Sequence, residues 1–178
     1  FLGNIRTTDA IIHVLRCCDN GNITPVDGSI DPVRDKEISD TELQFKDLET
    51  VENRIGKVQK QAVTGGDKVA KRMYDILLQY KAVLEQGKSA RTVQLDNKED
   101  EKLVAELGLL TAKPVLYVCN VDEAGASKGN QYTQAVADAI QDEGAQMLIV
   151  ARDNDARLAV PESPVEIHHL IVGTVQVA

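Results

Sequence analysis

The spacing of apolar residues changes along the 178-residue chain, and each change predicts a different kind of element. Apolar runs of strand length lie at 10–18, 115–121 and 146–151, and most are bounded by residues typical of turns. Apolar residues at helical spacing fill 98–114 and about 130–142. Strands that alternate with helices are typical of an α/β domain, so the sequence predicts the rear part of a doubly wound parallel sheet.

Between the first and second of these strands, the pattern becomes that of two long helices. Apolar residues recur at spacings of three and four residues on either side of TGGD (64–67), where two glycines end one helix and Asp67 can cap the next. Helices joined by so short a turn are expected to fold back as an antiparallel coiled-coil hairpin. The expected seam pairs Leu48, Val51, Ile55 and Val58 with Ile76, Tyr80 and Val83, and it continues through Ala62, Val69 and Met73.

Composition and charge restrict the classes of function. Hydrophobic residues make up 43% of the chain, which can fill a core, but aromatic residues make up only 3%, so that core is expected to be aliphatic. A net charge of −8 disfavours general binding to phosphate backbones, so we expect no DNA partner, and RNA only through a local basic face. No apolar run approaches the roughly 18 residues of a membrane span, so we expect a soluble cytoplasmic protein without a membrane partner.

The stretch VLYVCNVDEAG (115–125) places polar residues where a buried strand is expected to end. Ligands of open α/β sheets lie beyond the carboxyl ends of the strands, so Asn120 and Glu123 are candidates for a ligand site. The alternative is a helix-entry loop whose Asp122 and Glu123 are only solvated. From these residues by themselves, both interpretations stay open.

Several ordered segments resemble one known family. NIRTTDAIIHVLRC, DNGNITPVDGSIDPVRD, the expected hairpin and LLTAKPVLYVCNVDE are similar to the YchF, or Obg-like ATPase, family of P-loop NTPases, from residue 1 to about 150. The resemblance implies a nucleotide-binding domain over 1–35 and 96–151, interrupted by a helical insertion over 36–95. The segment 152–178 does not resemble the family and is left unassigned, and the opening FLGNIRTTD, which looks like the end of a helix, suggests that an upstream part is missing.

The same resemblance assigns the candidate site residues. The family uses an Asn-x-x-Glu motif in place of the Asn-Lys-x-Asp of most GTPases. Asn120 would contact the purine edge, Glu123 would face its Watson–Crick side, and Val121 would lie beside the base. This motif is consistent with ATP as ligand, or GTP, with Mg²⁺ needed only in the complete protein. The family is also associated with ribosomes and translation.

The sequence departs from the family in its phosphate-binding motifs. It contains no Gly-x-x-x-x-Gly-Lys-Ser/Thr, so we expect no catalytic residue and no ATP hydrolysis from this chain on its own. The alternative function is a non-catalytic coiled-coil module that binds a ribosome or a protein. Its candidate contacts are the basic residues near the hairpin tip, which fit ribosomal RNA or an ordinary solvated face equally well: Lys60, Lys68, Lys71 and Arg72, with Lys57 beside them.

The cysteines and histidines have structural explanations that we favour. Cys17 and Cys18 are adjacent, and neighbouring thiols seldom bridge comfortably, so packing is preferred to a redox role. The three cysteines lack a metal-binding spacing and are expected to be reduced thiols. His13 is expected to be a core or sheet-edge residue, and His168 and His169 would point to opposite faces of a strand, which disfavours a metal site.

Overall fold

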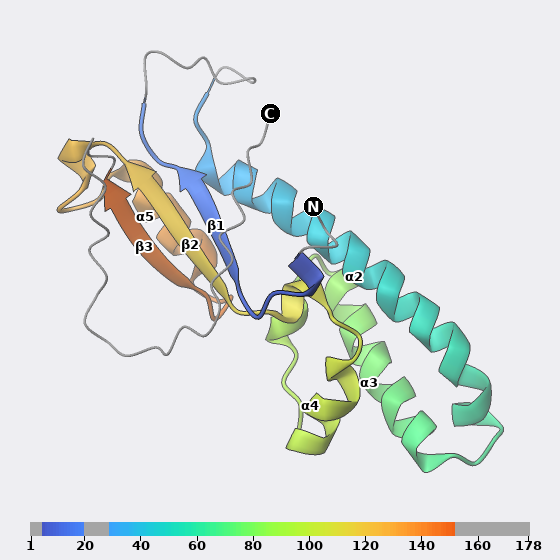
Figure 1. The fold of residues 1–178 in the computed structure, drawn as a ribbon. Helices are drawn as coiled ribbons and strands as arrows, with labels where there is room; N and C mark the ends of the chain where they lie inside the picture. Colours follow the sequence, from blue (N-terminus) through green and yellow to red (C-terminus); the bar gives the residue numbers. More distant parts are fainter. Residues whose placement is uncertain (1–4, 20–28, 152–178) are drawn as a thin grey trace. The chain divides into compact units, whose positions relative to one another are not determined.

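The structure is a computed structural model that describes residues 5–19 and 29–151 (Figure 1). It divides into two compact units. Among the described residues, the sheet unit contains 8–19, 29–38 and 114–151, and the helical unit contains 5–7 and 39–113. The predictions for segment 152–178, including His168 and His169, fall outside the described residues.

The sheet unit confirms the predicted α/β class. Three parallel strands, β1 (Ile11–Arg16), β2 (Val115–Val121) and β3 (Gln146–Ala151), lie in the order β1-β2-β3. The register places Arg16 opposite Asn120, and Asn120 opposite Val150. All three carboxyl ends therefore meet at one edge of the sheet, where ligands of open α/β sheets bind.

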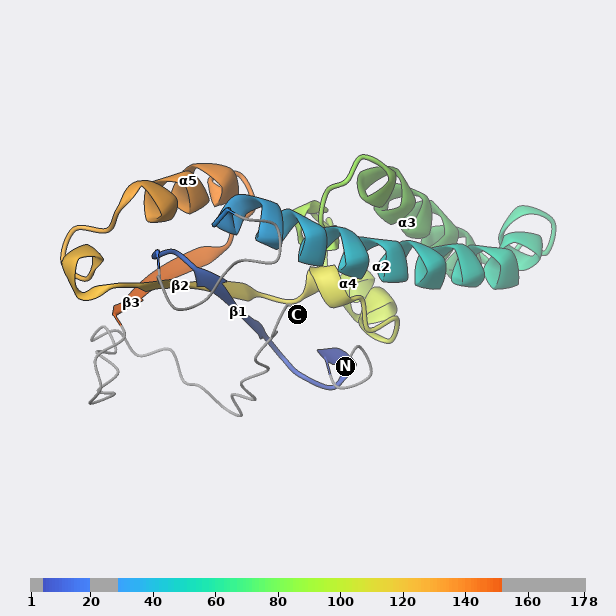
Figure 2. The same ribbon diagram turned by 90° about the horizontal axis from the view of Figure 1, so that it is seen from above.

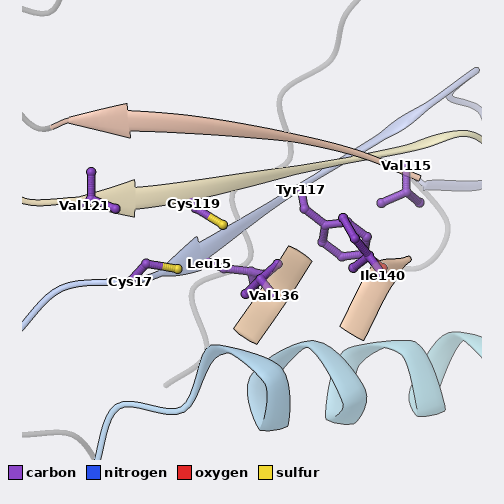
Figure 3. Packing of buried hydrophobic residues seen from close by; sticks show 8 residues of the cluster. All are labelled: Leu15, Cys17, Val115, Tyr117, Cys119, Val121, Val136 and Ile140. Carbon is purple, nitrogen blue, oxygen red and sulfur yellow. The ribbon is translucent and has the colours of Figure 1, made fainter. Parts of the chain in front are cut away.

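One face of this sheet forms the aliphatic core. Burial alternates along β2, so Val115, Tyr117, Cys119 and Val121 point to the same side. Helix α5 (Gln131–Ile140) packs on that side through Val136 and Ile140, as Figures 2 and 3 show. His13 is buried beside Tyr117, with ring centroids 5.7 Å apart, in line with the expectation of a core residue.

Helix α2 (Pro32–Val63) begins earlier than the sequence pattern predicted. The helical insertion was expected to begin at residue 36. In the structure the Asp31 side chain accepts a hydrogen bond from the backbone N–H of Arg34, 3.0 Å away, and Pro32 is the first helical residue. An N-cap followed by proline is a helix-start signal that the apolar pattern does not contain. No helix in the described part of the chain is both long and apolar enough to cross a membrane.

An ion pair between the buried Lys36 and the half-buried Glu143 holds the first turns of α2 within the sheet unit. Lys36 Nζ lies 2.5 Å from Glu143 Oε1, and the Tyr117 hydroxyl donates to the other oxygen of Glu143 at 3.1 Å. The Lys36 ammonium also lies 5.3 Å from the centroid of the Tyr117 ring. The lysine is therefore compensated by a carboxylate and an aromatic face, as a buried charge requires.

The helical unit pairs the rest of α2 with α3 (Lys68–Glu85), side by side and antiparallel (Figures 1 and 2). Asp67 caps α3 as predicted, accepting from the N–H groups of Val69 and Ala70. The expected seam is only partly right, because Val69 is 63% exposed and Val83 lies outside the buried cluster. The cluster instead uses a broader face of α3, made of Met73, Ile76, Leu77, Tyr80 and Leu84.

The broader face has a cause in the segments that follow α3. Helix α4 (Lys98–Ala105), the short 3-10 helix η1 (Ala90–Thr92) and the residues just before the 3-10 helix η2 (Leu110–Ala112) supply side chains to the same cluster. Leu103 and Leu107 pack there, so the structure groups α4 with the hairpin helices and not with the sheet. The single helix predicted over 98–114 is broken at Gly108, whose φ of +59° is incompatible with a continuing helix.

Candidate functional site

Asn120 lies at the carboxyl edge of the sheet, one residue before the end of β2. It is half-buried, and strand alternation directs its side chain to the face opposite the core. Its backbone carbonyl accepts a hydrogen bond from the N–H of Cys17 at 2.8 Å. Its side-chain amide has no hydrogen-bond partner among the described residues, so both its donor and its acceptor are available to a ligand.

Glu123 follows on the short helix η3 (Glu123–Gly125) and is exposed. The start of η3 is fixed by Asp122, whose carboxylate accepts from the backbone N–H of Gly125 at 2.9 Å. The expectation for Val121 needs correction, because its side chain is fully buried in the core and cannot lie beside a base in this conformation. Any contact from Val121 has to come from its backbone.

Asn130 is a residue of this loop that the sequence patterns did not single out. Its side-chain oxygen caps α5 by accepting from the N–H groups of Tyr132 and Thr133, each 3.0 Å away. Its side-chain nitrogen donates to the carbonyl oxygen of Cys17 at 2.6 Å. Its place immediately before α5 is a recognisable N-cap signal, but the contact with β1 crosses 113 residues of sequence and has no local signature.

A pocket of about 430 Å³ opens between the ends of β1 and β2 and the start of α5. Its lining includes Cys18, Asp19, Asp122, Asn130 and Tyr132, and the Tyr132 hydroxyl donates to Asp19 at 3.2 Å. Asp122 and Ala124 flank Glu123 in sequence, but neither Asn120 nor Glu123 lines the pocket. The pocket therefore lies beside the predicted residues and does not enclose them.

The cysteines at this edge are placed differently from one another. Cys17 and Cys119 are fully buried and share a hydrogen bond between their thiols, which together with burial raises the pKa of Cys17. A thiol with a raised pKa is rarely ionised and therefore unreactive, which agrees with a packing role. Cys18 is half-buried and lines the pocket. Within the described ranges, no group of three His, Cys, Asp or Glu side chains could hold a metal ion.

The basic residues of the hairpin do not form one uniform surface. Lys60 and Lys68 are exposed and have no described side-chain partner, and Lys71 lies 3.5 Å from Asp75 in an exposed pair. Arg72 differs from the lysines, because its guanidinium binds Asp100 and lies 3.1 Å from Asp96. The hydrogen bond to Asp100, followed in size by the one to Asp96, raises the pKa of Arg72. The expectation of Arg72 as a free cation for a partner is therefore corrected.

Comparison with known proteins agrees with this architecture. The chain is 40% identical over 161 residues to the ribosome-binding ATPase YchF of Bacillus subtilis and 36% identical over 150 residues to Obg-like ATPase 1 of rice (Oryza sativa subsp. indica). These alignments cover 89% and 84% of this chain. The structure of the Schizosaccharomyces pombe YchF GTPase matches with a TM-score of 0.73 and 30% identity over 84% of this chain. The chain is homologous to the YchF and Obg-like ATPases.

The homology covers only part of those proteins. The chain spans 43% of the Bacillus YchF, 38% of the rice Obg-like ATPase and 42% of the fission-yeast structure. No family model matches the chain. The comparisons thus confirm the suspected family and the α/β fold, and they do not assign a role to any single residue.

Proposed function

We propose that this chain supplies the purine-contacting part of a nucleotide-binding domain in a ribosome-associated NTPase of the YchF type. The observation that carries the proposal is the Asn120 side chain, a half-buried amide with no described partner at the carboxyl edge of a parallel sheet. An exposed carboxylate, Glu123, follows three residues later on η3. Homology to proteins named as ATPases and GTPases supports a purine nucleotide as the ligand.

The two side chains suit a purine for chemical reasons. An asparagine amide can donate to and accept from the edge of a purine at once, and a carboxylate accepts hydrogen bonds from ring or exocyclic N–H groups. Guanine offers the carboxylate an N1 proton and a 2-amino group, whereas adenine offers neither there. The glutamate is longer than the aspartate of most GTPases, and the motif lacks their lysine, so guanine is selected less strongly. We therefore propose ATP, or GTP, as the ligand, with Val121 contributing only backbone groups.

The chain's part in catalysis is limited by the motifs in its sequence. Phosphoryl transfer requires backbone N–H groups, a lysine and Mg²⁺ around the phosphates, and the sequence contains no motif that supplies the first two. We propose that Mg²⁺ and hydrolysis belong to a complete NTPase of this family and that this chain holds none of the catalytic residues.

Substitution of Asn120 tests the nucleotide proposal. In the full-length gene product, Asn120→Ala should weaken ATP binding by about 1–3 kcal/mol, because a polar group on the base loses its partner. Asn97→Ala is a matched control, since Asn97 caps α4 in the helical unit and is not part of the site. Calorimetry that gives the same affinity for wild type and Asn120→Ala would remove Asn120 from the base site.

We propose that the hairpin tip, defined here as Lys60, Lys68 and Lys71 around the turn, contacts ribosomal RNA. Residues 57–71 hold four lysines against one aspartate, a local charge of +3 in a chain of −8. Lysines that neutralise phosphates release counterions, so binding should weaken steeply with salt. Arg72 is left out of this surface because Asp96 and Asp100 already compensate it.

A charge-matched pair of triple variants tests the tip. Replacing Lys60, Lys68 and Lys71 with glutamate should abolish co-sedimentation of the full-length gene product with ribosomes while ATP affinity stays unchanged. The control replaces three exposed lysines elsewhere in the helical unit, Lys88, Lys98 and Lys102, with glutamate, which changes the net charge equally. Equal loss in both variants would attribute the effect to net charge. Ribosome binding without any nucleotide binding would favour the alternative of a non-catalytic interaction module.

A further inference from the structure

The segment between Asn120 and Asn130 forms a loop, and both of its ends are hydrogen-bonded to Cys17, the residue that follows β1. Cys17 donates its N–H to the Asn120 carbonyl at 2.8 Å and accepts at its own carbonyl from the Asn130 side-chain nitrogen at 2.6 Å. Both ends of the loop are thus held by the backbone of a single residue. Glu123 lies on this loop, so its position relative to Asn120 depends on that closure.

Inside the loop, Gly125 lies close to both Val121 and Asn130. A Cβ atom added to Gly125 would lie 3.0 Å from the Val121 side chain and 3.4 Å from the Asn130 side-chain nitrogen. The N–H of Gly129 donates to the carbonyl of Gly125 at 2.9 Å. The Asn130 amide therefore lies beside the short helix that carries Glu123, and it is hydrogen-bonded to Cys17 at the end of β1. A displaced Asn130 leaves η3 without one of its neighbours.

We propose that Asn130 is a positioning residue of the purine site, which acts through Cys17 and Gly125 to fix Glu123 relative to Asn120. This inference rests on the proposed nucleotide function. Asn130 performs two separable tasks, because its oxygen caps α5 and its nitrogen bonds Cys17. Serine is an equally good N-cap but has no amide donor, so Asn130→Ser removes the link to β1 and retains the cap.

Binding of a neutral nucleoside by this chain separates positioning from stability. Adenosine is titrated to millimolar concentration while the ¹H–¹⁵N resonances of Asn120 and Glu123 are followed, in wild type and in Asn130→Ser. Because adenosine has no phosphates, its binding is not weakened by repulsion from the net negative charge of the chain. Gln134→Ser on the exposed side of α5 is the control for a polar-to-serine change. Helical circular dichroism and hydrogen exchange of the α5 amides report whether the cap is intact.

We expect Asn130→Ser to retain the α5 protection of wild type and to bind adenosine about two- to tenfold more weakly, the effect of one lost hydrogen bond. Hydrogen exchange at the N–H groups of Gly125 and Gly129 should become faster in the same variant. Equal adenosine affinity in wild type and Asn130→Ser would overturn the positioning role and leave the nucleotide proposal standing. Adenosine that shifts neither Asn120 nor Glu123 in wild type would overturn the nucleotide proposal, and the positioning role with it.

If Asn130→Ser does not fold, the comparison is made with Asn130→Asp, which is also an N-cap without the amide donor. A folded Asn130→Asp with weakened adenosine binding supports the positioning role. Unfolding of both variants would show that the Cys17 contact maintains the fold as a whole, which contradicts separable tasks and overturns the inference.

Discussion

Asp47 of α2 is fully buried, and its carboxylate holds the segment that leads into β2. It accepts three hydrogen bonds of 2.7 Å each, from the N–H groups of Leu110 and Thr111 and from the Thr111 hydroxyl. The same hydroxyl accepts from the N–H of Ala90 at 2.8 Å, so η1 and η2 are joined to α2 by one network. Asp47→Ala removes the acceptor and leaves two buried N–H groups unpaired.

The magnitude follows from the number and kind of bonds. Each hydrogen bond to a charged group contributes about 1.5–3 kcal/mol, and each buried polar group left unpaired costs about 1–3 kcal/mol. The three bonds share one carboxylate, so their energies do not add independently, and removing the carboxylate also removes the penalty for burying it. We therefore expect Asp47→Ala to lower the free energy of unfolding by about 3–5 kcal/mol, which lies within the cost of about 2–6 kcal/mol for two buried N–H groups left unpaired.

Urea denaturation followed by helical circular dichroism at pH 7 measures this change. Glu49→Ala is the control, since Glu49 lies on the same helix in an exposed pair with Lys46 and should change stability by about 0.2–1 kcal/mol. Thr111→Val should cost about 1–3 kcal/mol, because it removes the hydroxyl and leaves the buried N–H of Ala90 unpaired. The double variant should lose less than the sum of the two single variants, since both break the same bond.

The refuting result is specific. A loss below about 1 kcal/mol for Asp47→Ala, within the range of the exposed control, would mean that the buried bonds are replaced by water or by a local rearrangement. Strict additivity of Asp47→Ala and Thr111→Val would separately show that the two side chains do not share the bond that the structure gives them.

Three further predictions concern single features of the chain. Gly56 lies within α2 with open space where a Cβ would be, so Gly56→Ala should stabilise the protein by about 0.5–1 kcal/mol in the same urea assay, and destabilisation would refute it. The hydrogen bond from Arg72 lowers the pKa of Asp100, so this pair stabilises the fold above the ordinary carboxyl pKa of about 4, and the contribution is lost as the pH falls through the lowered value. When the pH is lowered from 6 by about 3 units, the urea midpoint should therefore fall more in wild type than in Arg72→Ala. Equal slopes of urea midpoint against pH in the two proteins would exclude this pair as the cause of the pH dependence. The purified chain should show no Mg²⁺-dependent ATP hydrolysis above background, and turnover of about 1 per second would contradict the missing phosphate motif.

Local pattern in the sequence was sufficient for most elements of this fold. The apolar runs at 115–121 and 146–151 became β2 and β3 within the predicted bounds, because a buried strand needs only a short run of apolar residues that suit a pleated sheet. The turn at 64–67 and the cap by Asp67 were likewise predictable, since capping depends on residues within three positions. The signal for the early start of α2 is also local, because it consists of Asp31 as N-cap followed by Pro32. A prediction from the spacing of apolar residues does not detect this signal.

Only the tertiary structure decided which side chains meet across long stretches of sequence. Leu77 and Leu84 are buried in place of Val69 and Val83 because η1, α4 and the residues just before η2 cover a wider face of α3 than a single partner helix would. Arg72 is paired with Asp100, 28 residues away, and Asn130 with Cys17, 113 residues away. Periodicity reports which face of an element is apolar, but it carries no information on which distant donor will satisfy a given acceptor, because that choice is made by how the elements pack.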